Sequence, residues 1–162
     1  MRTKNWDRTS MQSGALAESM LEAEMNRRAW EAYRPSVDTG IDMIVATPDC
    51  GKDVKRVQIA IGSHHSQQHS DSPGYIVNKT DCHIRDDVDI IALYIEEGNH
   101  WFILPTQIYI SAMMQGYYST KGKTFYINVN KLKPPMDAAL NAFWVFNEKN
   151  LNSKAIKRTF FP

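Results

Sequence analysis

Residues 57–63 read VQIAIGS, an apolar run that contains a single glutamine, Gln58. Such a run predicts a buried β-strand. Residues 41–46 (IDMIVA) predict another strand, and the turn-rich residues 47–53 (TPDCGKD) between them predict a hairpin whose returning strand spans residues 55–61. Because side chains alternate along a strand, Gln58 and Ala60 point to the same face.

Asp42, in the first strand of this hairpin, is the second polar residue that needs an explanation. If the turn centres on Gly51, the numbers of paired residues sum to 102 and Asp42 lies across from Ala60, with Gln58 a diagonal neighbour on the same face. A slip of one residue would place them on opposite faces. Burying an Asp is costly without a partner or a metal ion. The alternative is an Asp capped by backbone amides at a strand end.

The remaining pattern predicts an α/β (α+β) domain of three layers, in which helices flank a central mixed sheet of mostly antiparallel strands. A helix begins near Ser13, its predicted N-cap, and gives way to an extended segment at residues 29–33. Residues 63–73 read as an exposed loop. Further strands are predicted at residues 75–77, 90–96, 101–104 and 124–129, and further helices at residues 105–114 and 136–146. No linker interrupts the pattern, so residues 1–162 are expected to form one domain.

Composition narrows the class of protein. Hydrophobic residues make up 43% of the chain, a value typical of globular proteins. No apolar run approaches the roughly 20 residues that cross a bilayer, and the first residues lack the apolar stretch of a secretory signal. Cys50 and Cys82 are too few for a disulfide framework. We therefore expect a soluble protein of the cytoplasm, or one associated with the nucleoid.

Charge is unevenly distributed along the chain. Residues 118–162 carry eight Lys and Arg against two Asp and Glu, hence +6, whereas residues 1–117 carry eleven against sixteen, hence −5. This asymmetry suggests a basic portion that contacts a polyanion. A solvated basic tail explains the charge equally well.

Several short motifs follow one another along the chain, and their order is informative. They are Gly14-x-x-x-Glu18, then Trp30 and Pro35, then Gly40-Ile41-Asp42, then Arg56-Val57-Gln58-Ile59, and finally residues 87–94 (DVDIIALY) and 101–105 (WFILP). Together they resemble the core of the PD-(D/E)XK nucleases, and most closely the variety found in group I intron homing endonucleases and restriction-like proteins. The resemblance covers residues 13–110; residues 111–162 form a basic C-terminal extension that resembles no family.

The resemblance implies a restriction-endonuclease-like fold and a metal-dependent DNA endonuclease. Asp42 would ligate the metal, Gln58 would mark the second ligand position together with the backbone carbonyl of Ile59, and Glu18 would be the supporting carboxylate. Mg²⁺ (or Mn²⁺) suits such oxygen ligands and the hydrolysis of phosphodiesters. Double-stranded DNA is the implied partner and a homodimer or homotetramer the implied assembly. The candidate DNA contacts are the lysines of the basic extension, Lys121, Lys123, Lys131 and Lys133.

Ala60 departs from the family pattern, because a lysine normally stands at this position. Losing one preorganised donor of this kind costs about 10²–10³ in rate. Three explanations are open: a deliberate change of lysine to alanine, a natural module that has lost catalysis, or a lysine from elsewhere, for which Lys79 is the candidate.

Two other classes of function remain as alternatives to the nuclease. One is a non-catalytic module that binds DNA or protein on the same fold, and the other is an unrelated α+β domain with a chance Asp–Gln hairpin. His64, His65 and His69 could form a metal site, although their Ser- and Gln-rich surroundings favour a solvated loop. Cys50 and Cys82 lack partners at ligand spacing and are expected to be plain thiols.

Overall fold

The computed structural model describes residues 10–37, 39–51, 53–65, 74–78, 87–114, 118–119 and 124–162. Its elements are α1 (Ser10–Arg27), β1 (Glu31–Tyr33), β2 (Met43–Ala46), the 3₁₀ turn η1 (Pro48–Cys50), β3 (Val54–His65), β4 (Gly74–Asn78), β5 (Ile90–Ile95), β6 (His100–Pro105), α2 (Thr106–Ala112), β7 (Tyr118–Ser119), β8 (Thr124–Asn128), α3 (Met136–Ala139), the 3₁₀ turn η4 (Phe143–Asn147) and α4 (Lys154–Phe160).

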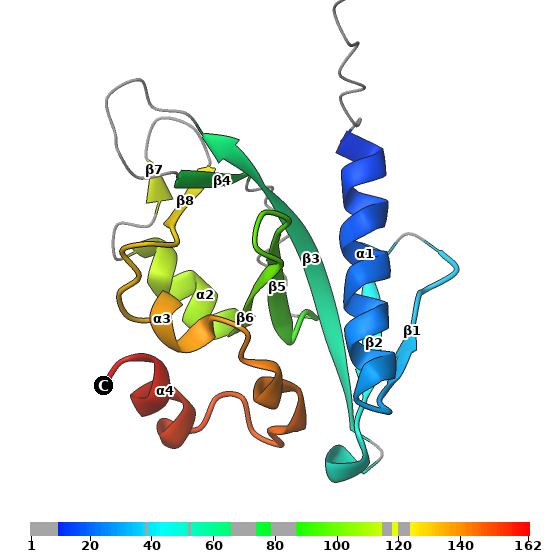
Figure 1. Ribbon diagram of the computed structural model, residues 1–162. Helices are drawn as coiled ribbons and strands as arrows, with labels where there is room; N and C mark the ends of the chain where they lie inside the picture. The colour runs from blue at the N-terminus through cyan, green and yellow to red at the C-terminus, as the bar shows by residue number, and fades with distance from the viewer. Residues whose placement is uncertain are drawn as a thin grey trace, which may run out of the picture.

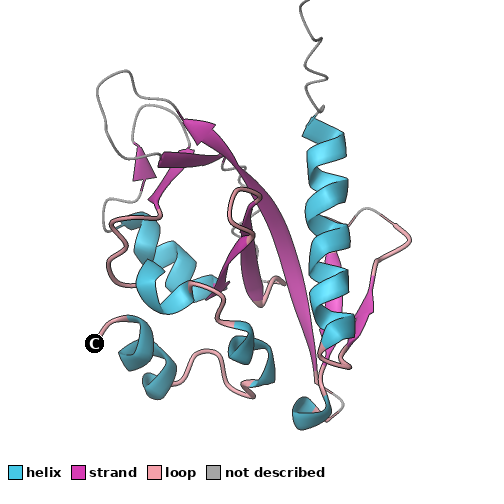
Figure 2. Ribbon diagram, in the orientation of Figure 1, coloured by secondary structure: helices cyan, strands magenta, loops and turns pink. Residues whose placement is uncertain are grey.

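A mixed sheet with helices on both sides forms the domain, as predicted from the sequence. The strand order is β1-β2-β3-β4-β8-β7, with β5 paired to β3 and β6 paired to β5. The β3–β5 pair is parallel and the other pairs are antiparallel. Figure 1 shows α1 along β3, and α2, α3 and α4 grouped on the other side of the strands. Figure 2, coloured by secondary structure, shows the same layers.

The core is centred on β5 and β6. Every residue of β5 (IIALYI) is buried, as is every residue of β6 after His100. A strand buried on both faces reads as a continuous apolar run, which explains why both strands could be found from sequence. On one side, α1 contributes Ala17, Leu21 and Met25, all fully buried. The central strands are therefore covered by helices on each side.

The long strand β3 carries different partners along one edge. Val57 pairs with Met43 of β2 and Ile90 of β5, and Gly62 pairs with Val77 of β4 and Ile95 of β5. A strand has only two edges, so β2 and β4 must share the edge opposite β5. Among the described residues, the pairing with β2 ends at Val57 and the pairing with β4 begins at Gly62, so residues 58–61 are paired with neither strand on this edge, which we call the open edge.

The predicted boundaries need four corrections. α1 begins at Ser10, so Ser13 lies inside the helix instead of capping it. Ser63, His64 and His65 belong to β3 rather than to a loop, because β4 pairs with them; residues 66–73 lie outside the described residues. The predicted helix 136–146 is two short elements, α3 and η4. A further helix, α4, has Ser153 as its N-cap and was missed by the sequence analysis.

The predicted hairpin register was also wrong, by two residues. Met43 pairs with Val57 and Ala46 with Val54, so the numbers of paired residues sum to 100 instead of 102. The turn contains η1 and ends at Gly51, whose φ of 62° lies in the left-handed region that glycine adopts easily. Asp42 lies just before the first paired residue, Met43, and its N–H donates to the carbonyl of Val57, so Asp42 does not pair with Ala60. Because the shift is an even number of residues, each side chain keeps its face.

Candidate active site

Asp42 is held at the beginning of the hairpin by both its backbone and its side chain. Its N–H donates to the carbonyl of Val57 (3.0 Å), so Asp42 and Met43 both lie against Val57 where the β2–β3 ladder begins. Its carboxylate oxygen Oδ2 accepts from Gln58 Nε2 (2.7 Å) and from the backbone N–H of Ile59 (2.7 Å). Asp42 thus has the side-chain partner that its burial requires, and it also caps a backbone amide of β3. The bond from the Ile59 N–H is the kind of backbone capping that was the alternative explanation for Asp42.

The amide of Gln58 is oriented by this contact. Gln58 is only 7% exposed. Since an ionised carboxylate only accepts hydrogen bonds, the NH₂ end of the amide must face Asp42. The other end, Oε1, is buried and has no hydrogen-bond partner among the described residues. A buried acceptor left in this state costs about 1–3 kcal/mol, so the atom needs an explanation.

The backbone carbonyl of Ile59 supplies a further oxygen beside the same carboxylate. Its N–H donates to Asp42 at the open edge of β3. In an antiparallel pair a residue turns its N–H and its C=O toward the same neighbour, so the carbonyl of Ile59 faces the open edge as well. A carboxylate, a buried amide oxygen and a backbone carbonyl therefore come from neighbouring positions of one hairpin. Oxygen donors of these kinds fit Mg²⁺ or Mn²⁺.

Glu18 projects from α1 and contacts Arg34. Its Oε2 lies 3.6 Å from Arg34 Nη1, and the same guanidinium donates to Glu22 (2.7 Å) and to Ser19 Oγ (3.1 Å). Arg34 follows β1, and Tyr33 of β1 pairs with Ile44 of β2. Glu18 is thus tied to the segment beside β2, whereas Asp42 and Gln58 contact each other. That Glu18 is the supporting carboxylate beside Asp42 and Gln58 remains a prediction.

Ala60 lies one pleat beyond Gln58 on the same face of β3. It is half-buried, packs against the core and pairs with Leu93 of β5. Its methyl group can neither donate a hydrogen bond nor carry charge. The described hairpin therefore has no general acid, base or cation at position 60.

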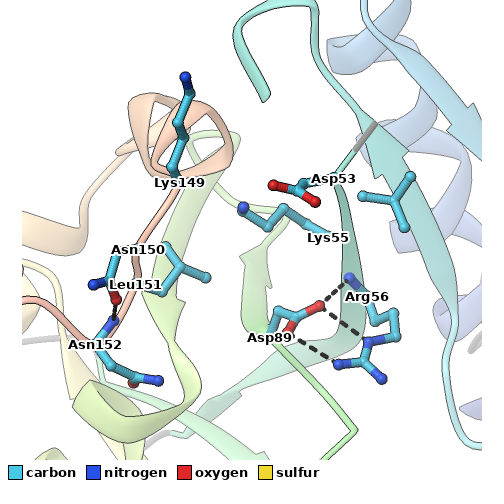
Figure 3. Close-up of a pocket in the computed structure, with 9 residues that line it drawn as sticks. Asp53, Lys55, Arg56, Asp89, Lys149, Asn150, Leu151 and Asn152 are labelled. Carbon is cyan, nitrogen blue, oxygen red and sulfur yellow. Dashed lines mark hydrogen bonds and ion pairs between the residues drawn. The ribbon is translucent and has the colours of Figure 1, made fainter. Parts of the chain in front are cut away.

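An ion pair that the sequence analysis did not single out lies close to Gln58. Arg56 Nε and Nη2 donate to the two carboxylate oxygens of Asp89 (3.1 and 3.2 Å), and the N–H of Arg56 also donates to Asp89 Oδ2 (2.8 Å), as Figure 3 shows. These hydrogen bonds raise the pKa of Arg56 above its ordinary value, although burial acts in the opposite direction. In return, the N–H of Asp89 donates to the carbonyl of Arg56 (2.9 Å).

This pair fastens the start of β5 to β3, two residues before Gln58. Its signal in the sequence was an acidic residue immediately before the apolar run of residues 90–95. The parallel pairing that brings it to Arg56 joins residues 33 apart, and no local pattern reports such a contact.

The remaining candidates are placed only in part. Lys131 and Lys133 are exposed in the segment after β8. Lys121, Lys123, Lys79, His69 and Cys82 lie outside the described residues, and only the backbones of His64, His65 and Cys50 are described. In the described ranges, no three His, Cys, Asp or Glu side chains gather as metal ligands, so the amide and carbonyl oxygens would have to complete a site at Asp42. No helix within those ranges is long and apolar enough to span a bilayer.

The sequence matches no protein-family model and no curated protein. Solved structures that are similar to the chain include two nucleases. One is a bacterial homing endonuclease, I-Ssp6803I, with a TM-score of 0.64 and 17% identity over 93% of this chain and 99% of that one. The other is Hjc, a Holliday junction resolvase from the archaeal hyperthermophile Archaeoglobus fulgidus, with a TM-score of 0.43 and 13% identity over 73% of this chain and 85% of that one.

At these identities the similarity concerns the fold, and the TM-score of the resolvase is too low to carry an argument. The homing endonuclease matches 93% of this chain, so the match has to include most of the basic extension. The predicted α+β fold, a mixed sheet with flanking helices, is therefore confirmed and is shared with a nuclease.

Proposed function

We propose that this chain is a metal-dependent DNA endonuclease of the PD-(D/E)XK kind, of the homing or restriction-like type. Its active site comprises Asp42, Gln58 and the carbonyl of Ile59, with Glu18 in support and Ala60 at the position of the family's lysine. The shared fold with a bacterial homing endonuclease supports this proposal, as does the order of motifs along the sequence.

One observation carries the proposal. The amide of Gln58 is locked by Asp42 through its nitrogen, while its oxygen is buried without a partner among the described residues. In a purely structural hairpin an apolar side chain would avoid the cost of that oxygen. A metal ion at the open edge would use it, together with the Asp42 carboxylate and the Ile59 carbonyl. The glutamine at this position is therefore explained as a ligand.

The roles of the residues follow from their chemistry. When bound, a divalent ion would supply water activation and charge neutralisation at a phosphate. Asp42 contributes the negative charge that attracts the ion, and its hydrogen bonds from Gln58 and Ile59 hold it in one orientation. Gln58 and Ile59 add neutral oxygens. With alanine at position 60, no ammonium from this position orients the water, so we expect turnover by this chain to be slower by about 10²–10³ than with lysine.

The test restores the missing group. Ala60→Lys should nick supercoiled plasmid in Mg²⁺ or Mn²⁺ at a rate about 10²–10³ above that of the unmodified chain. The matched control is Ala60→Lys combined with Asp42→Asn, which keeps the new lysine and removes the charge that holds the metal. Absence of cleavage by Ala60→Lys in every metal would argue against catalysis. Equal cleavage by the control would place the activity in a contaminant or another site.

Ala60 also favours a second candidate, a DNA-binding module on the same fold that does not cut. The two are separated by binding to double-stranded DNA in Ca²⁺, an ion that commonly supports binding without hydrolysis. The nuclease proposal expects Ca²⁺ to strengthen binding through Asp42, and therefore Asp42→Asn to abolish the effect. A DNA-binding module expects affinity that is the same with and without Ca²⁺, in both proteins.

The assembly follows from the substrate. Cutting both strands of a duplex takes two active sites, and this chain carries one candidate site, so a homodimer or homotetramer is proposed. Light scattering after size exclusion, with and without a DNA duplex, measures the mass directly. A monomer that cleaves only one strand would contradict a double-strand endonuclease while leaving the metal site intact.

A further inference from the structure

A cavity lies between α2 and the end of α4. Its volume is about 320 Å³, which is enough for a small organic ligand. Three residues of α2 and three at the end of α4 line it, namely Gln107, Ile108, Ser111, Lys157, Arg158 and Phe161. The proposed metal site uses none of these residues.

Part of the lining is apolar. Ile108 belongs to the core, and Phe161 is half-buried and packs against that core. The N–H of Phe161 donates to the carbonyl of Lys157 (2.9 Å), which holds the backbone of Phe161 at the end of α4. Apolar atoms that face a cavity are removed from water when an apolar group covers them. The cavity therefore suits a ligand with an apolar body.

The charged part of the lining is positive. Lys157 and Arg158 are exposed, and no carboxylate is among the residues that line the cavity. Within the described part of the chain, neither side chain has a carboxylate partner. The last turn of a helix favours cations, so their presence there needs no ligand. A ligand explains why both of them line one cavity, because an anion there would meet two positive charges.

We propose that this cavity binds a carboxylate carried on a small apolar body. A guanidinium group can hold a carboxylate through two parallel hydrogen bonds, and an ammonium group adds a further charged donor. The apolar body lies against Ile108 and Phe161, which a bare inorganic anion would leave uncovered. The carboxylate can come from a free organic acid or from the C-terminal residue of a peptide. Since binding needs neither metal nor DNA, this site can fail while the proposed function stands, and the reverse.

Titration of the isotope-labelled full chain with phenylacetate, followed by NMR, tests the site. We expect saturable shifts of amide signals from residues 107–111 and 157–161, with a Kd of about 1 mM. Phenylacetamide keeps the ring without the charge and should bind about tenfold more weakly, since one charge-assisted hydrogen bond is worth about one decade. Arg158→Ala should weaken phenylacetate binding by a similar factor. The matched control, Lys154→Ala, removes an exposed lysine of the same helix outside the cavity and should bind as the unmodified chain does.

A second arm distinguishes the two sources of the carboxylate. The affinity for a tetrapeptide that ends in phenylalanine, with a free C-terminal carboxylate, is compared with that for phenylacetate. Peptide binding that is tighter by about tenfold or more assigns the cavity to a peptide C terminus, and any smaller gain assigns it to a free organic acid. Phenylacetate binding that is absent, that phenylacetamide equals, or that is the same in Arg158→Ala and Lys154→Ala would overturn the proposal.

Discussion

At the scale of single residues, the hydrogen bond between Gln58 and Asp42 determines which end of the buried Gln58 amide is left without a partner among the described residues. Gln58 Nε2 donates to Asp42 Oδ2 at 2.7 Å, and this contact leaves the buried Oε1 to find a partner that the described protein does not supply. A group that costs stability in the isolated protein is the kind of feature that functional sites retain.

Replacing the Gln58 side chain tests separately its effect on stability and its proposed role as a metal ligand. Gln58→Leu has a similar volume. It removes the unpartnered oxygen, which favours folding, and the hydrogen bond to Asp42, which opposes it, so we expect the free energy of unfolding without metal to change by no more than about 2 kcal/mol. Chemical denaturation in EDTA measures this. The same variant should lose the stabilisation that Mg²⁺ or Mn²⁺ gives to the unmodified chain. A large loss of stability in EDTA, with metal stabilisation retained, would assign Gln58 to the core instead.

Position 60 permits a similar comparison. If it lies at the mouth of the site, Ala60→Lys can extend its stem to solvent, and the melting temperature should fall by no more than about 4 °C. Ala92, fully buried on β5 and paired with Ile59, is the matched control. Ala92→Lys buries an unpaired charge and should cost several kcal/mol. Equal destabilisation by the two variants would place Ala60 in the core.

At the scale of elements, the residues at the C-terminal end of α1 and just after it pack against the C-terminal segment. Arg28 lies over the ring of Phe143 in η4, 3.9 Å from its centroid, and 5.8 Å from that of Trp30. Trp30 in turn packs on Phe146, with centroids 6.1 Å apart. Glu24 holds Arg28 in place through an ion pair and also pairs with Arg27 (2.8 Å). A carboxylate thus orients a cation–π contact between distant parts of the chain.

This arrangement predicts a stability that depends on pH. Burial raises the pKa of Glu24, but the hydrogen bonds and charges of Arg27 and Arg28 together lower it by more than burial raises it. The pKa of Glu24 therefore lies below its ordinary value of 4.5. The stabilisation is therefore complete above the unfolded-state pKa and is lost as the pH falls through the folded one. Glu24→Gln should destabilise the protein by about 1 kcal/mol or less at pH 7, because the pair is partly screened.

Thermal melts of the two proteins across the acidic range check this expectation. The difference in melting temperature should shrink as the pH falls below about 4.5 and vanish once the carboxyl group is protonated in both states. A difference that persists unchanged at the acid end would mean that Glu24 acts through packing rather than through its charge.

At the scale of the whole molecule, the net charge of +1 conceals a division between an acidic N-terminal part and a basic C-terminal part. Net charge this small gives little attraction to DNA over long distances, so affinity has to come from where the cations lie. In the described extension, Lys131 and Lys133 are exposed beside β8, and β8 is bound to the sheet through β4. The basic extension is thus part of the same sheet as the proposed active site.

If Lys131 and Lys133 bind DNA phosphates, replacing both with alanine should flatten the salt dependence of binding by about 0.9 for each phosphate that is no longer neutralised. Fluorescence anisotropy of a labelled duplex in Ca²⁺ gives the slope. The affinity for Ca²⁺ itself should stay the same, because the proposed site holds the ion through Asp42 and Gln58. A slope identical to that of Lys154→Ala would move the DNA surface to another part of the molecule.

The sequence by itself determined the features that depend on neighbours a few residues apart. Alternation along residues 41–61 predicted that the side chains of Asp42 and Gln58 lie close together, and they form a hydrogen bond although the predicted register was wrong. The apolar runs at residues 90–96 and 101–104 predicted two strands, and β5 and β6 confirm them. Identification of the fold required only these periodicities and the order of the elements.

Only the tertiary structure decided the features that depend on distant partners. Leu140 bridges Phe102, and Asn141 exchanges hydrogen bonds with the backbone of Trp101 (2.6 and 3.0 Å), which ends the helix that residues 136–146 were predicted to continue. The Arg56–Asp89 pair and the open edge of β3 arise in the same way, from strand pairings that join remote segments. Backbone groups must find partners wherever the fold brings them, and that demand overrides local preference where the two conflict.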